Sequence, residues 1–141
     1  MKPHRAVVAL LALTIGACVA SEAFPTVVDN RSQHPIAVRY HHKDYPSWSA
    51  VWTIPPGEAQ SFAREHWIQD IIAIQIQDGD RMIALASPEM KTIRNACANS
   101  LLTRRLKIAG DCYVVYLGDG RWTATAQMPS GISNRLNKSL Q

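Results

Sequence analysis

Hydrophobic and polar side chains alternate along most of the chain from residue 24 onward, and this period of two is typical of half-buried β-strands. Segments with this pattern are predicted as strands, and they are 26–28, 36–41, 48–54, 60–64, 68–77, 81–86, 106–108, 112–117 and 122–126. We expect Trp48 and Trp52 to share an inward face, and Ile72, Ile74 and Ile76 to share another. Because the shortest segments are weak signals, the pattern predicts about seven or eight strands.

Turn residues separate these segments. Pro55-Pro56-Gly57 ends the strand before it, because proline cannot donate a ladder hydrogen bond and glycine readily adopts a positive φ. Two Asp-Gly pairs, Asp78-Gly79 and Asp119-Gly120, stand between alternating segments, and this combination is a strong signal for a tight β-hairpin. We therefore predict two hairpins, one around each Asp-Gly pair.

One segment has helical spacing instead. Ser87 is a residue type that caps helices, and Pro88 suits the first helical turn. The apolar residues that follow recur at helical intervals, and they are Met90, Ile93, Cys97 and Leu101. The sequence therefore predicts a short helix over residues 88–99 with Cys97 on its inward face.

These elements predict an all-β fold with one short helix. Many short strands joined by turns are typical of an antiparallel β-sandwich, and we expect one of immunoglobulin-like character. A small β-barrel is the alternative. The Cys…Trp…Cys order of true immunoglobulin domains is absent, because no tryptophan lies between Cys97 and Cys112.

The first 23 residues have the pattern of a secretory signal peptide. Lys2 and Arg5 form a basic start, and Ala6–Ile15 is almost wholly apolar. A helix of that length rises only about 15 Å, half of the roughly 30 Å hydrocarbon core of a membrane. We therefore expect three parts: a signal peptide (1–23), a single β-sandwich domain (24–127) and a flexible C-terminal tail (128–141).

Two ways of processing this segment stay open. Small residues before Ser21 and before Phe24 fit cleavage after Ala20 or Ala23, which would release a soluble exported chain, periplasmic or secreted. Alternatively, Ile15-Gly16-Ala17-Cys18 resembles the lipobox of bacterial lipoproteins, which implies lipidation of Cys18 and an anchor in the envelope. In that case, the lipid would be the protein's contact with a membrane.

The cysteines agree with export. Removal or lipidation of Cys18 leaves Cys97 and Cys112, an even number in an oxidising compartment. We expect a disulfide between them, which should stabilise the fold by roughly 3 kcal/mol for a loop of about 15 residues. Two free thiols are the alternative, and a structural zinc lacks the paired C-x-x-C spacing that it usually needs.

Charge and motifs exclude several classes of function. The net charge of +4 is modest and part of it lies in the removable segment. The densest basic group, Arg104, Arg105 and Lys107, fits the solvated side of a strand, so nucleic-acid binding is not expected. Phosphate-binding loops and hydrolase motifs are absent. A small hydrolase stays the weakest alternative, centred either on His66 beside Glu65 or on the His41-His42 pair. A calcium site is not expected, because Asp78-Gly79-Asp80 lacks the further acids of a calcium-binding loop.

A metal site is a second functional hypothesis. His41, His42 and Asp44 lie together in the polar connection before the predicted strand 48–54, and His66 could join them through the fold. Imidazole and carboxylate groups are ligands for zinc or copper. Adjacent residues on a strand point to opposite faces, however, so both histidines reach one ion only in a loop. The leading expectation is that the protein has no cofactor.

Aromatic residues support the leading functional hypothesis. Tyr45 and Trp67 lie at strand ends, and their flat apolar faces with a polar group suit contacts with proteins, peptides or sugars. We therefore expect a non-catalytic exported domain that binds an envelope protein, peptide or glycan through loops at one end of the sandwich. This hypothesis rests on exclusion of the other classes, since architecture alone does not specify function.

Overall fold

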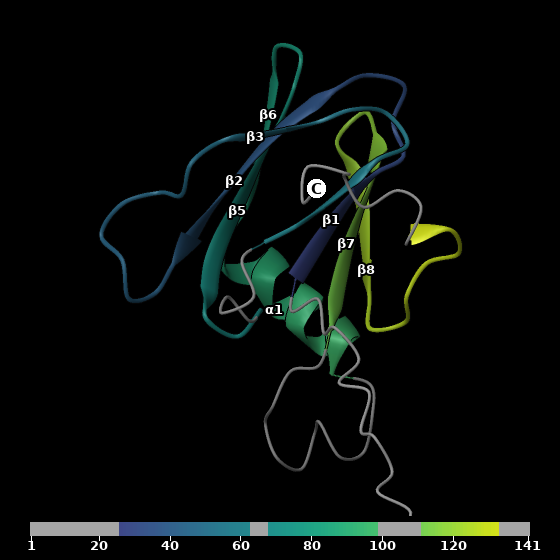
Figure 1. Ribbon diagram of the computed structural model, residues 1–141. Helices are drawn as coiled ribbons and strands as arrows, with labels where there is room; N and C mark the ends of the chain where they lie inside the picture. Colours follow the sequence, from purple (N-terminus) through teal and green to yellow (C-terminus); the bar gives the residue numbers. More distant parts are fainter. Residues whose placement is uncertain (1–25, 63–67, 99–110, 133–141) are drawn as a thin grey trace, which may run out of the picture.

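The computed structural model describes residues 26–62, 68–98 and 111–132, which form two four-stranded β-sheets and one helix (Figure 1). The first sheet has the order β4 (Ala59–Ser61), β1 (Thr26–Asn30), β7 (Cys112–Gly118) and β8 (Arg121–Thr125). The second sheet has the order β3 (Trp52–Ile54), β2 (Ile36–His42), β5 (Ile71–Asp78) and β6 (Arg81–Leu85). Helix α1 (Ser87–Cys97) lies at one end of the two layers.

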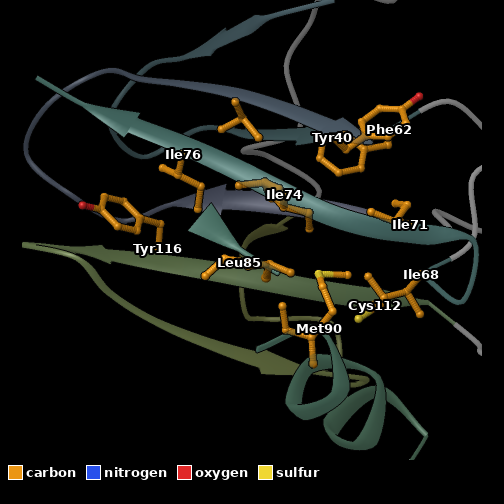
Figure 2. Packing of buried hydrophobic residues seen from close by; sticks show 14 of the residues in the cluster. Tyr40, Phe62, Ile68, Ile71, Ile74, Ile76, Leu85, Met90, Cys112 and Tyr116 are labelled. Carbon is orange, nitrogen blue, oxygen red and sulfur yellow. The ribbon is translucent and has the colours of Figure 1, made fainter. Parts of the chain in front are cut away.

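The two sheets pack face to face over one hydrophobic core, so the predicted β-sandwich is confirmed. Figure 2 shows this core, with Tyr40 and Phe62 near one end and Tyr116 near the other. Neither sheet closes into a barrel within the described residues. One pairing differs from a purely antiparallel arrangement, because β1 runs parallel to β7.

Part of the outer face of the first sheet, along β1 and the start of β7, is buried as well as the inner face. All five residues of β1 are buried, because Val28 points into the main core while Val27 packs with Ala59, Tyr113 and Ile132 on the other side. Strands that are buried on both faces lose the alternation of apolar and polar residues. Ile132 belongs to the segment predicted as a tail, so the packed domain continues beyond residue 127.

The second sheet keeps the alternation, with one irregularity. Burial alternates along the whole of β2, but the register between β2 and β5 shifts between His41 and His42. As a result Ile71, Ile74 and Ile76 are buried, whereas Ile72 is 43% exposed. The prediction that Ile72 faces inward with Ile74 is therefore wrong, because a β-bulge reverses the face of the residues that precede it.

Both predicted hairpins are present, with turns that suit their residues. The β7–β8 turn is Asp119-Gly120, and both residues have positive φ (55° and 75°), as a type I′ turn requires. In the β5–β6 hairpin, Asp78 pairs with Arg81, so the two turn residues are Gly79 and Asp80. Gly79 supplies the positive φ there (57°).

Helix α1 is close to its predicted bounds, although its N-cap is Ala86 rather than Ser87. The Ala86 N–H donates to the Glu89 carboxylate (3.3 Å), which helps to satisfy the free end of the backbone. Met90, Ile93 and Cys97 form its buried face, as their spacing predicts.

The predicted disulfide between Cys97 and Cys112 is present and joins the end of α1 to the start of β7. One turn before Cys97, Arg94 donates from Nη2 to the Ile71 carbonyl at the start of β5 (2.8 Å). The helix is therefore attached to one strand of each sheet.

Within the described ranges, no helix is long and apolar enough to cross a membrane. The strand predicted at 106–108 lies outside these ranges.

Candidate functional site

The long connection from β2 to β3 extends away from the layers at one end of the sandwich (Figure 1). Its return is fixed to β2, because the Ser49 N–H donates to the Tyr40 carbonyl (2.8 Å) and the Tyr40 N–H donates to Ser49 Oγ (2.9 Å). Its start is held by Lys43, whose ammonium lies 2.7 Å from the Asp70 carboxylate. This hydrogen bond raises the pKa of Lys43.

Trp48 lies on the outer face of the second sheet, so the prediction that it shares an inward face with Trp52 is wrong. The Trp48 ring packs against two outward-facing residues of β2: the Arg39 guanidinium is 4.9 Å from the ring centroid, and the His41 ring is 5.4 Å away. Trp52 stacks on Tyr40 in the core instead (5.6 Å). The two tryptophans separate because β3 begins only at Trp52, and residues 48–51 are not a strand.

Tyr45 lies in the same loop as Trp48 and is 55% exposed. The Tyr45 carbonyl accepts a hydrogen bond from His41 Nε2 (2.9 Å), and its ring lies 5.0 Å from the His42 ring. Tyr45 and Trp48 also line a hollow of ≈ 140 Å³ with the end of β2. Arg39, His41, Tyr45 and Trp48 are called the aromatic surface below. The structure thus places Tyr45 at an exposed loop, as predicted.

The predicted metal ligands His41 and His42 are not brought together. His41 faces outward and uses Nε2 to donate to Tyr45, whereas His42 is buried and accepts the Asp44 N–H at Nδ1 (3.1 Å). The Asp44 carboxylate lies 3.8 Å from the same nitrogen. Among the described residues, no three His, Cys, Asp or Glu side chains gather as a metal site would need.

The outer face of the second sheet continues from the aromatic surface. Cross-strand pairing places Arg39 opposite Gln75 and Ala37 opposite Gln77, which itself faces Met82. These residues and Val51 line a hollow of ≈ 290 Å³ next to Arg39. Val51 and Met82 are more than half exposed there (58% and 51%). Sequence reasoning did not single out Arg39, Val51 or Met82, because only the pairing of distant strands places them side by side.

A larger hollow of ≈ 820 Å³ lies at the opposite end of the sandwich, between the two Asp-Gly turns and the β1–β2 connection. Its lining mixes carboxylates with an arginine and a histidine. Beneath it, the Tyr116 hydroxyl donates to the Asp78 carboxylate (2.6 Å) and accepts the Gly120 N–H (3.1 Å). Burial, followed by the hydrogen bond to Asp78, raises the pKa of Tyr116. This end is rigid and carries charges of both signs.

Three of the predicted site residues, Cys18, His66 and Trp67, lie outside the described residues. No protein family, curated protein or solved structure matches this chain. The geometry of the described residues is therefore the basis for a functional proposal.

Proposed function

We propose that this chain is an exported, non-catalytic β-sandwich domain that binds another component of the cell envelope through the aromatic surface. Export is supported by the signal-peptide pattern of residues 1–23 and by the Cys97–Cys112 disulfide, since disulfides persist in oxidising compartments.

The difference between the outer faces of the two sheets carries this proposal. On the outer face of the first sheet, Val27 and Tyr113 are buried with Ala59 and Ile132, and the exposed Leu117 of β7 lies near the β7–β8 turn. The outer face of the second sheet carries the partly exposed Trp48 and the exposed Val51, and Tyr45 is exposed in the loop at the end of β2, with its ring beside His42. Tryptophan, tyrosine and arginine are enriched among the residues that dominate binding energy at interfaces.

The surface is also held in place before any ligand arrives. From β2, the Arg39 guanidinium and the His41 ring pack against the Trp48 ring. Ser49 fixes the end of the loop through two hydrogen bonds with the backbone of Tyr40. A surface that is ordered in advance loses less conformational entropy on binding. Loops that stand on a rigid sandwich are a common place for recognition.

Co-sedimentation of the purified domain with envelope fragments from an expressing cell tests the proposal. Trp48→Ala and Tyr45→Ala should each weaken binding by about 10-fold, because aromatic anchors commonly contribute 1–2 kcal/mol or more. Leu117→Ala is the matched control: this residue is 39% exposed but lies beside the β7–β8 turn at the other end. Circular dichroism should show that all three variants keep the fold.

Two results would contradict the proposed function. One is absence of any saturable binding by the wild-type domain. The other is binding that Trp48→Ala and Tyr45→Ala leave unchanged while Leu117→Ala weakens it, which would move the binding site to the opposite end.

A further inference from the structure

Arg39 is a fixed positive charge at the centre of the second sheet's outer face. Its Nε donates to Gln75 Oε1 (2.7 Å), and its guanidinium lies over the Trp48 ring. Within the described residues, no carboxylate forms an ion pair with Arg39. Because Nε is occupied by Gln75, the two terminal nitrogens are the part of the fork that is available to a ligand.

In the part of the chain that the structure describes, no carboxylate belongs to the face around Arg39. None of the outward-facing residues of the four strands is acidic, and besides Arg39 and His41 they are Ala37, Thr53, Ala73, Gln75, Gln77, Met82 and Ala84. The nearby carboxylates point elsewhere, since Asp44 lies beside the buried His42 and Asp70 pairs with Lys43. Charge complementarity therefore favours a ligand with a negative group at Arg39.

The shape around Arg39 favours a sugar over a peptide. The hollow of ≈ 290 Å³ has apolar walls at Val51 and Met82 and amide groups at Gln75 and Gln77, which suit the C–H faces and hydroxyls of a sugar ring. Extended peptides gain much of their affinity by pairing with a free strand edge. Arg39 lies on β2, whose two edges are already paired with β3 and β5.

We infer that the aromatic surface and its adjoining hollow bind an acidic polysaccharide, with a sugar carboxylate on Arg39 and a sugar ring against Trp48. This inference rests on the proposed function and adds the chemical class of its ligand. Arg39 would be the residue that distinguishes acidic from neutral glycans, because a guanidinium fork binds a carboxylate with two parallel hydrogen bonds.

Isothermal titration of the folded, oxidised domain with three polymers tests this inference. The polymers are polygalacturonate, its fully methyl-esterified form and polyglutamate, which separate an acidic glycan from a neutral glycan and from an acidic peptide. We expect binding to polygalacturonate alone, with an affinity that falls as salt concentration rises. Arg39→Gln should weaken it at least about 10-fold, and Arg39→Lys should weaken it less, because it keeps the charge and loses the fork.

Arg121→Gln is the matched control, because it removes the same charge from an exposed arginine near the opposite end and should change the affinity less than about twofold. Equal binding of the methyl ester, equal or tighter binding of polyglutamate, or an unchanged affinity in Arg39→Gln would each overturn the inference. If polygalacturonate does not bind while co-sedimentation with envelope fragments still depends on Trp48, only the ligand class is wrong. If both fail, the proposed function fails with it.

Discussion

At the scale of single residues, Tyr116 links two turns that are far apart in the sequence. Its hydroxyl donates to Asp78 at the β5–β6 turn and accepts from Gly120 at the β7–β8 turn. The Tyr116 side chain is buried and its two hydrogen bonds are partly buried, and a buried polar group that loses its partner is costly. One hydroxyl therefore connects the two sheets at the end opposite the aromatic surface.

Removal of this hydroxyl should lower stability. Tyr116→Phe loses a hydrogen bond to a carboxylate and leaves the Gly120 N–H without its acceptor, which we expect to lower the free energy of unfolding by about 2 kcal/mol. Urea unfolding at pH 7 measures the change. Tyr45→Phe is the control, since Tyr45 is largely exposed, and it should differ from wild type by less than about 0.5 kcal/mol.

The same residue makes a prediction about alkaline pH. The pKa of Tyr116 is raised above its ordinary value of 10.0, so the folded protein holds this proton more tightly than the unfolded chain does. The contribution to stability is therefore complete below pH 10 and declines as the pH rises from 10 towards the folded pKa. Tyr116→Phe should lose less stability than wild type between pH 9 and 11. Equal losses in the two proteins would contradict this role, because buried Tyr40 and Tyr113 are present in both.

At the scale of elements, α1 is held by its two attachments. The disulfide joins it to β7, and Arg94 joins it to the start of β5. The helix spans only Ser87–Cys97, and isolated helices of this length are marginal in water, so tertiary contacts must supply most of its stability.

The double variant Cys97→Ala/Cys112→Ala should therefore unfold more easily. The disulfide joins residues 15 positions apart, and a loop of this size is stabilised by about 3 kcal/mol in the chain-entropy account. Urea unfolding of the variant, of oxidised wild type and of reduced wild type measures this difference. A loss below about 1 kcal/mol would show that packing of Met90 and Ile93 holds the helix without the covalent link.

At the scale of the whole molecule, the two outer faces differ. The first sheet is buried on both sides along β1, whereas the second presents Arg39, Trp48 and the adjoining hollow on its outer side. Under the proposed export, the way residues 1–23 are processed would decide what this face can reach. Cleavage before Ser21 or Phe24 would release the domain, whereas lipidation of Cys18 would leave it on a membrane.

The intact mass of the protein purified from an expressing cell distinguishes these two forms. We expect a processed chain, beginning at Ser21 or Phe24 or lipidated at Cys18, that is lighter by two hydrogens because of the Cys97–Cys112 disulfide. An unprocessed chain that begins at Met1, or two free thiols, would contradict export. A stoichiometric metal ion in the same spectrum would favour the hypothesis of a metal site at His41 and His42.

Part of the candidate site was predictable and part was not. Exposure of Tyr45 follows from its place beside Pro46 in a polar connection, and the prediction is confirmed. The position of Trp48 was predicted wrongly, because alternation was extended across residues that are not a strand. The sequence alone does not indicate Arg39 as a site residue, because outward-facing arginines are common on strands and its neighbours depend on the fold.

The sequence by itself determined the local elements, the two hairpins and the disulfide. These depend on neighbours in the chain: the alternation within a strand, the positive φ of Asp119-Gly120, and an even pair of cysteines. Only the tertiary structure decided which side chains share a face, because Arg39 and Gln75 meet across 36 positions and their register depends on distant pairing. The bulge at Ile72 is an example, because an irregularity of one residue in the pairing with β2 places this side chain at the surface and not in the core.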